Sequence, residues 1–295
     1  MNLVSYNTWK TFFICSFALA SCVKSLDIAP PAHISQNVLV GVLHPDSSIK
    51  IRIFKTLPSI SKENNYEGIN NLVVNIFEDK NQKIVLKSTG NGYYSTNIKP
   101  KAGHFYAIEA IISENNILTA QDSIPIFELP LIQLTKPNPD NYNSNPDVIF
   151  TKNTNRQPYY WFSLNFSKKN INSPLTILSD SPYLDIFNSK INNIDGRRDY
   201  EVITRIKPDM PLGKEIRIGF VNSIKDTDAA YLYISCLSSN YDKYLKTAIT
   251  AYQNSLVDNA GDLKNPFGDF LPVYSNVKNG LGIFVGYNSK KVLLK

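Results

Sequence analysis

Side chains that commonly carry chemistry are scarce in this chain. It has three cysteines and three histidines among 295 residues. The histidines, His33, His44 and His104, lie far apart and lack the spacing of common metal-ligand motifs, so we expect no metal site and no cofactor. The sequence also lacks H-E-x-x-H, G-x-S-x-G, a P-loop and a G-x-G-x-x-G that opens a helix. None of these motifs therefore predicts an enzyme.

The few cysteines exclude a disulfide framework. Cys15 and Cys22 lie at the apolar N-terminus, which leaves Cys236 without a disulfide partner. Cys236 lies in "AAYLYISCLS", an apolar run rich in strand-forming residues, and this predicts a buried small hydrophobic side chain. The alternative is a nucleophile, although no histidine lies near Cys236 in the sequence.

Long apolar runs are missing after the N-terminus, since no stretch of 18 or more apolar residues could span a bilayer there. The N-terminus itself has Lys10, a short apolar segment over residues 11–18, and then "LASC", which ends at Cys22. This pattern is typical of a bacterial lipobox. It predicts a signal peptide over residues 1–21 and lipidation of Cys22. The alternatives are an ordinary signal peptide with a chance cysteine and a buried apolar N-terminal helix.

Clustered arginine is missing as well. The net charge is +6, but most of the basic residues are lysines scattered along the chain, and only Arg197 and Arg198 are adjacent arginines. Proteins that bind nucleic acid gather Arg and Lys on one face. We therefore expect no nucleic-acid partner and assign the charge to solubility.

The first half of the mature chain has a residue pattern typical of a β protein. A short tether is expected over residues 22–34, and residues 35–128 hold short Val-, Ile-, Tyr- and Phe-rich runs between polar turns. This spacing predicts an antiparallel sandwich, with a tight turn of positive φ at Asn91-Gly92. The stretch "TGNGYYSTNIKPKAGHFYAIEA" resembles immunoglobulin-like and transthyretin-like sandwiches in its G-x-Y and P-x-x-G-x-x-Y pattern.

The second half is also predicted to be mainly β. An Asn- and Pro-rich segment over residues 129–158 predicts a linker or a long surface loop. Residues 159–295 predict a second β-rich domain, a sandwich or a barrel, with one helix near 240–254 that Ser239 caps. The apolar stripe expected on this helix consists of Tyr241, Tyr244, Leu245, Ala248 and Tyr252.

The C-terminal stretch "NPFGDFLPVYSNVKNGLGIFVGYNS" (265–289) has the most specific pattern in the chain. Together with the lipobox, the G-x-Y sandwich and the Tyr- and Lys-rich helix, it resembles the domain of unknown function 4249, a family of envelope lipoproteins of Gram-negative bacteria. The resemblance implies an outer-membrane location, with the periplasmic or surface face left open. Its members often resemble accessory lipoproteins of TonB-dependent transporters, which implies such a transporter as a partner.

This tail favours a role in shape over a role in chemistry, because Asp269 and Lys278 are its only charges. We expect it to complete the second domain and to form a surface on which a partner docks. The residues expected to dock the partner are Phe267, Phe270, Tyr274, Asn276, Asn279, Gly280 and Phe284.

Small residues in the tail also predict its backbone. Asn276, Asn279 and Gly280 can adopt left-handed conformations in a tight turn. Gly282 and Gly286 flank "IFV", which indicates a strand closely approached by another backbone. A binding site lined by backbone is the alternative for these glycines.

Four other segments contain residues that could form a site. "LSDSPYLD" (178–185) is interpreted as an Asx turn rather than a carboxylate pair. "YYWF" (159–162) is interpreted as half core rather than a platform for a sugar. The Asp-containing loop 258–269 fails the EF-hand template and leaves an irregular calcium site as the alternative. Asp122-Ser123-Ile124 is similar to an envelope O-glycosylation acceptor and also has the pattern of a strand end.

The leading hypothesis is a lipid-anchored, non-enzymatic, two-domain β protein that acts as a binding or accessory subunit at the outer membrane. An envelope hydrolase acting on glycan or peptide is the first alternative, since two carboxylates from different strands could form a site that sequence spacing does not reveal. A structural or adhesive surface lipoprotein is the second.

Overall fold

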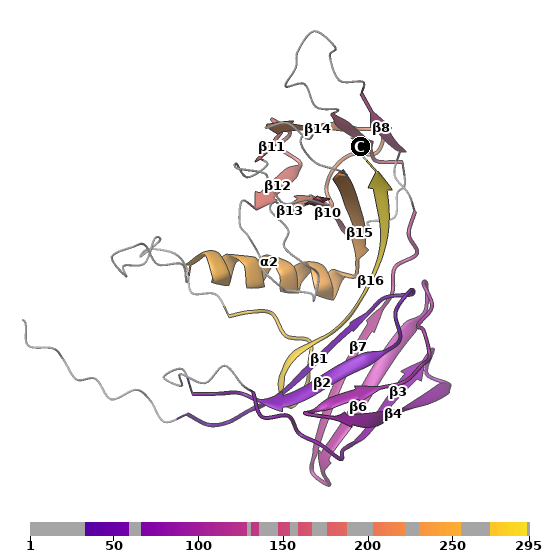
Figure 1. Ribbon diagram of the computed structural model, residues 1–295, viewed down its shortest axis with the longest axis vertical. Helices are drawn as coiled ribbons and strands as arrows, with labels where there is room; N and C mark the ends of the chain where they lie inside the picture. The colour runs from indigo at the N-terminus through magenta and orange to yellow at the C-terminus, as the bar shows by residue number, and fades with distance from the viewer. Residues whose placement is uncertain are drawn as a thin grey trace, which may run out of the picture.

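The protein is mainly β, with one helix in the part of the chain that the structure describes, as the sequence predicts (Figure 1). The computed structural model describes residues 33–58, 66–128, 131–135, 147–153, 159–166, 176–187, 203–221, 230–254 and 272–293. No helix within these ranges is long and apolar enough to cross a membrane. Cys22 and the loop 258–269 lie outside the described residues.

The N-terminal region is a β-sandwich, which confirms the predicted architecture. Its strands are β1 (Asn37–Leu43), β2 (Lys50–Lys55), β3 (Val73–Glu78), β4 (Gln82–Gly90), β5 (Tyr93–Ser95), β6 (Phe105–Ser113) and β7 (Asn116–Ser123). In β2, Ile51 and Ile53 are buried while Arg52 and Phe54 lie on the opposite face, which is the alternation of a half-buried strand. The inward side chains form one apolar core that includes Tyr94 and Tyr106.

The sheet of this region curls back toward the C-terminal tail. Its strand order is β16-β1-β2-β5-β4-β3-β6-β7, where β16 (Leu281–Leu293) is the last strand of the chain. Thr119 of β7 and Lys278, just before β16, exchange two backbone hydrogen bonds of 2.8 and 3.4 Å. The two ends of this strand series therefore meet at the tail.

The turn predicted at Asn91-Gly92 joins β4 to β5. Both residues have positive φ, 49° for Asn91 and 76° for Gly92, which is the geometry that a two-residue hairpin turn requires. A Cβ on Gly92 would lie 2.1 Å from the carbonyl oxygen of Ile53, so this position also excludes a side chain by close packing. The prediction of a tight turn is confirmed.

The C-terminal region is a second sandwich, formed by two sheets. Its strands are β8 (Leu131–Leu134), β9 (Val148–Thr151), β10 (Tyr159–Phe166), β11 (Thr176–Leu178), β12 (Leu184–Phe187), β13 (Ile203–Ile206), β14 (Glu215–Val221) and β15 (Ala230–Leu237). One sheet has the order β12-β13-β10-β15-β16 and the other β11-β14-β9-β8. A core that includes Phe150, Tyr160, Phe162 and Ile216 lies between them.

The expectation that residues 129–158 are a linker or a loop is wrong for two of its segments. Leu131–Leu134 and Val148–Thr151 are strands β8 and β9, which pair with each other, and β9 pairs with β14. Each is only four residues long and lies beside Asn- and Pro-rich sequence. Apolar runs of this length are too short to show the two-residue alternation of a strand, so the flanking Asn- and Pro-rich sequence indicated a loop.

Helix α2 (Ser239–Asn254) forms a third layer on the outer face of the β10-β15-β16 sheet (Figure 1). Tyr241, Leu245 and Ile249 are its buried apolar residues, and they recur every four positions. Tyr252 is 42% exposed, so the predicted stripe ends earlier than expected. The buried positions of the helix also include two polar residues, Asp242 and Asn254.

The helix cap lies one residue before the predicted one. Ser238 Oγ accepts a hydrogen bond from the Tyr241 amide at 3.1 Å, and the Ser238 carbonyl accepts the first helical bond from Asp242. These are the bonds of an N-cap residue. Ser239, which the sequence favoured as the cap, is exposed.

The "YYWF" segment packs into the protein on both of its faces, and only Tyr159 is partly rather than fully buried. Tyr160 and Phe162 face the core between the two C-terminal sheets. Trp161 faces the opposite side, beneath α2, and stacks on Phe187 at a centroid distance of 5.4 Å. The interpretation as half core was therefore too cautious, since helix α2 covers the second face.

Candidate functional site at the C-terminal tail

Strand β16 belongs to both β regions. Leu281–Gly286 pairs in parallel with Val38–Leu43 of β1. Tyr287–Leu293 pairs antiparallel with Tyr231–Leu237 of β15. Figure 1 shows this single long strand rising from the N-terminal sandwich into the C-terminal region. The sequence placed the tail in the second domain, and the structure corrects this, because half of the strand extends the N-terminal sheet.

Two glycines allow β16 to approach its neighbours. Gly282 has a φ of 110°, and a Cβ there would lie 2.1 Å from the Leu39 carbonyl oxygen. A Cβ on Gly286 would lie 2.5 Å from the carbonyl oxygen of Ser123 at the end of β7. Neither position has room for a side chain. The predicted close approach of another backbone is confirmed.

The asparagines of the tail hold β16 in place. Asn276 Nδ2 donates to the Phe284 carbonyl at 2.7 Å, and its Oδ1 accepts from the Phe284 amide at 2.9 Å. Asn279 donates to the Ile117 carbonyl at 2.9 Å and is the only one of the three predicted residues with a positive φ, 62°. Gly280 is required for a different reason, since a Cβ there would lie 2.7 Å from the Asn37 carbonyl oxygen.

The docking role expected for the tail aromatics needs correction. Phe284 has no exposed surface and lies in the core of the N-terminal sandwich, so it cannot contact a partner. Phe267 and Phe270 lie outside the described residues. The exposed side chains of the described tail include two aliphatic ones, Val273 at 44% and Leu281 at 41%.

Tyr274 joins the tail to helix α2. Its hydroxyl donates to Asn240 Oδ1 at 2.7 Å, and its amide donates to Thr247 Oγ1 at 2.8 Å. Lys243 Nζ lies 5.7 Å from the centre of the tyrosine ring, within the range of a cation–π contact. Tyr274 is thus half-buried and bonded to the helix.

Asp122, at the end of β7, is the polar centre of this junction. Its carboxylate accepts a hydrogen bond from the Ser238 hydroxyl and one of 3.0 Å from the Gly286 amide. Asn240 Nδ2 donates to the other carboxylate oxygen at 3.3 Å. One buried side chain thereby joins the N-terminal sandwich, the start of α2 and strand β16.

Burial raises the pKa of Asp122 to about 6, although the hydrogen bonds from Ser238 and Gly286 oppose this shift. The sequence showed Asp122 only as part of a tripeptide similar to a glycosylation acceptor. Because its partners lie more than 100 residues away, no local pattern could reveal this role. The weak signal available was an acidic residue at an inward position of a predicted strand.

A second buried polar cluster fixes α2 to the C-terminal sheet. Arg205 of β13 donates two hydrogen bonds to Asp242, of 2.6 and 2.9 Å, and one of 2.8 Å to Asp185. Trp161 Nε1 donates to Asp242 at 2.9 Å. Burial disfavours the Arg205 cation, but its bonds to Asp242 and Asp185 outweigh that effect and raise its pKa. These charged groups therefore pair with one another inside the protein.

A comparison with protein families finds a match that spans both sandwiches and the junction between them. The family model for the domain of unknown function DUF4249 matches residues 26–292. The chain belongs to the DUF4249 family. The matched range includes both sandwiches, α2 and nearly all of β16, so the DUF4249 unit is the joined body rather than either region alone. A search of curated proteins finds no significant match.

Cys236 of this DUF4249 protein is fully buried in the core between the C-terminal sheets. Burial, and to a smaller extent the nearby Glu128 charge, raises the pKa of its thiol to about 12. A thiol that stays protonated at neutral pH is a poor nucleophile. The structure supports the interpretation of Cys236 as a small hydrophobic side chain.

His44 and Ser289 form a contact that resembles part of a catalytic triad. His44 Nε2 lies 3.1 Å from Ser289 Oγ, while the Asp46 amide donates to His44 Nδ1 at 3.2 Å. Because Nδ1 accepts, the proton of the neutral ring must lie on Nε2, which then donates to the serine. A general base needs that nitrogen unprotonated. This pair holds β16 beside the end of β1 and is not arranged for nucleophilic attack.

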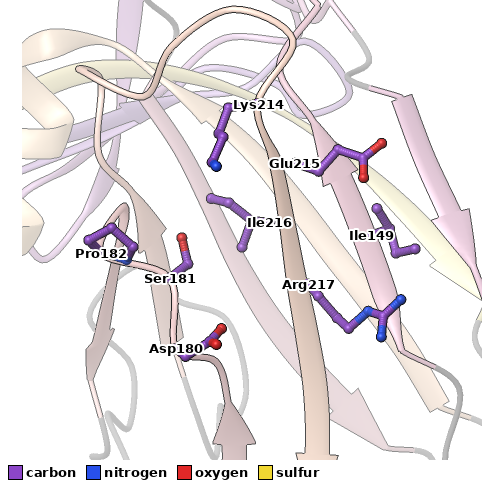
Figure 2. Close-up of a pocket in the computed structure, with 8 residues that line it drawn as sticks. All are labelled: Ile149, Asp180, Ser181, Pro182, Lys214, Glu215, Ile216 and Arg217. Carbon is purple, nitrogen blue, oxygen red and sulfur yellow. The ribbon is translucent and has the colours of Figure 1, made fainter.

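A hollow of about 380 Å³ lies beside β14 in the C-terminal region (Figure 2). Figure 2 shows Asp180 and Ser181 on one side of this strand, whereas Glu215 and Arg217 point to the other side, toward Ile149. The carboxylates of Asp180 and Glu215 therefore lie on opposite sides of β14 and do not form the convergent pair that a glycosidase uses.

The "LSDSPYLD" loop beside this hollow is held by serines. Ser179 Oγ donates to the Arg217 carbonyl at 2.7 Å and accepts from the Ser181 amide at 3.3 Å. Asp185, at its other end, points to Arg205. The expected turn is present, but a serine rather than Asp180 forms it, and the two aspartates do not act together.

Proposed function

We propose that this protein is a lipid-anchored, non-enzymatic accessory subunit of the outer membrane, and that it docks on a TonB-dependent transporter through the surface of its C-terminal tail. The observation that carries the proposal is the shared strand β16, which makes the two sandwiches one continuous body. A surface on such a joint is preorganised, and binding to it loses little conformational entropy.

The lipobox supports the membrane anchor. A diacylglycerol and a further acyl chain on Cys22 would hold the protein stably at a membrane. Strand β1 begins at Asn37, so the intervening chain spans at most about 50 Å when fully extended. An anchored protein would thus remain close to integral proteins of the same membrane.

The tail surface supports the docking role. Val273 and Leu281 are exposed aliphatic side chains on the tail, and Asn279 is an exposed polar residue near Leu281. Apolar side chains surrounded by polar ones are typical of protein–protein contact surfaces. The candidate catalytic groups Cys236, His44 and Asp180 offer no comparable support for the alternative hydrolase.

The test is affinity purification of the protein from detergent-solubilised outer membranes, with bound proteins identified by mass spectrometry. Leu281→Lys and Val273→Asp should reduce the recovery of a TonB-dependent transporter at least fivefold without lowering the thermal midpoint. Val85→Asp is the matched control, because Val85 is 60% exposed on strand β4 of the N-terminal sandwich. Absence of any transporter with the wild-type protein would refute the proposed partner, and equal recovery with all three variants would refute the tail as its site.

A further inference from the structure

One end of the N-terminal sandwich brings together the side chains of Glu78, Asp79 and His104. Glu78 ends β3, Asp79 begins the turn into β4, and His104 immediately precedes β6. His104 Nδ1 lies 2.7 Å from Asp79 Oδ2 and 3.0 Å from Glu78 Oε1. One ligand-type atom from each residue thus lies within 4.8 Å of the others. Because β3 and β6 are hydrogen-bonded neighbours, the sheet itself fixes this convergence.

The burial of Glu78 is a second and independent observation. Its side chain is only 5% exposed, and its Oε1 atom is enclosed by protein. Neither this oxygen nor His104 Nδ1 makes a hydrogen bond of acceptable geometry, although the two atoms lie 3.0 Å apart. A buried carboxylate oxygen is normally hydrogen-bonded. The near neighbours of these two atoms are instead each other, Asp79 Oδ2 and Lys101 Nζ.

The backbone fixes one carboxylate oxygen of Asp79, and the other oxygen faces the cluster. Its Oδ1 accepts a hydrogen bond from the Phe105 amide at 2.9 Å, while Oδ2 faces His104. A carboxylate oxygen whose direction is fixed by such a backbone bond is a suitable metal ligand.

Lys101 is the group that competes for this space. Its Nζ lies 3.1 Å from Glu78 Oε1, and its side chain is 60% exposed. A long exposed lysine can turn toward solvent without disturbing the fold. The alternative is that the cluster is an ion-pair group, in which Lys101 and His104 contact the carboxylates of Glu78 and Asp79.

We propose that Glu78, Asp79 and His104 bind a divalent transition-metal cation such as Zn²⁺, with solvent at the remaining position. One imidazole nitrogen and two carboxylate oxygens suit Zn²⁺, whereas Ca²⁺ takes six to eight oxygen ligands. Ligands about 2.0 Å from a tetrahedral ion are about 3.3 Å apart, so the contacts of His104 Nδ1 with Asp79 and Glu78, which are 2.7 and 3.0 Å, would need to lengthen by about 0.6 and 0.3 Å. The metal would join the β3–β4 turn to the start of β6.

The experiment is a calorimetric titration of the chelator-treated, detergent-solubilised mature protein with ZnCl₂. One ion should bind per chain with a micromolar or tighter Kd, and His104→Gln and Glu78→Gln should each weaken binding at least tenfold. His33→Gln is the matched control, because His33 is an exposed histidine that contacts Thr56. Absence of binding, equal affinity of His104→Gln and wild type, or displacement of Zn²⁺ by equimolar Ca²⁺ would overturn the proposal.

A fourth variant guards against loss of binding through misfolding. Lys101→Ala removes the competing ammonium from an exposed side chain, so it should increase Zn²⁺ affinity severalfold. Misfolding cannot produce such a gain. An unchanged or weakened affinity of Lys101→Ala would favour the ion-pair reading and contradict the metal site.

Discussion

Ser238 donates a hydrogen bond to Asp122 across the boundary between helix α2 and the N-terminal sandwich. The same hydroxyl oxygen accepts the Tyr241 amide at the helix N-terminus. A single side chain therefore both caps α2 and joins it to the last strand of the sandwich, so the two β regions should unfold together.

Asp122 should make stability depend on pH. Its folded pKa is raised from 3.8 to about 6, so the folded state holds this proton more tightly than the unfolded state does. The Asp122 contribution to the free energy of unfolding is therefore present below about pH 4 and is lost as pH rises to about 6, by up to about 3 kcal/mol. Urea denaturation of wild type and Asp122→Asn at pH 4 to 7 measures this.

The expected result is that the stability of Asp122→Asn relative to wild type improves as pH rises through this window. Asp46→Asn is the charge-matched control, because Asp46 is exposed. A constant difference between Asp122→Asn and wild type across the pH range would show that burial does not shift this carboxyl.

Ser238→Ala should destabilise the protein by about 1–3 kcal/mol, because it removes the helix cap and one of the hydrogen bonds to the buried Asp122 carboxylate. Ser239→Ala is the matched control and should change stability by less than about 0.5 kcal/mol, since Ser239 is exposed. Chemical denaturation of both variants gives the comparison. Equal losses of stability in Ser238→Ala and Ser239→Ala would contradict the assignment of Ser238 as the helix cap.

Gly282→Ala should destabilise the protein by more than about 3 kcal/mol or prevent folding. A Cβ there would lie 2.1 Å from the Leu39 carbonyl oxygen, in the parallel pairing that joins β16 to β1. Gly90→Ala separates the clash from backbone strain, because Gly90 has a φ of 92° but open space around it. Thermal unfolding should show a clearly smaller loss for Gly90→Ala, and similar losses would assign the effect to φ alone.

Cys236 should react slowly with a thiol reagent in the native protein and completely after unfolding. Its pKa of about 12 and complete burial both disfavour the reactive thiolate. Labelling of the mature protein at pH 8, with and without denaturant, measures the ratio. Rapid stoichiometric labelling of the native protein would reopen the nucleophile hypothesis.

Cys22→Ala should leave an uncleaved precursor that incorporates no labelled fatty acid, because lipidation of the thiol precedes cleavage in lipoprotein maturation. Cys15→Ala, within the apolar segment of the signal, should mature normally. Metabolic labelling followed by electrophoresis checks both. Normal maturation of Cys22→Ala would refute the lipid anchor.

The sequence alone determined the local features of this protein. Alternating Ile51 and Ile53 predicted a half-buried strand, and Asn91-Gly92 predicted its turn, because side-chain period and φ preference are properties of neighbouring residues. The spacing of Tyr241 and Leu245 predicted α2 for the same reason. Gly282 and Gly286 predicted close backbone approach, although not which backbone approaches.

Tertiary structure decided which distant groups meet. Asp122 and Ser238 lie 116 residues apart, and Glu78 and His104 lie on different strands, so no spacing rule relates them. Phe284 was expected to dock a partner because it is a large aromatic residue of the tail. Its strand instead pairs in parallel with β1, and its side chain lies in the core of the N-terminal sandwich. Strand pairing fixes the neighbours of each side chain through long-range hydrogen bonds, and only the folded sheet shows whether a polar residue serves stability or a site.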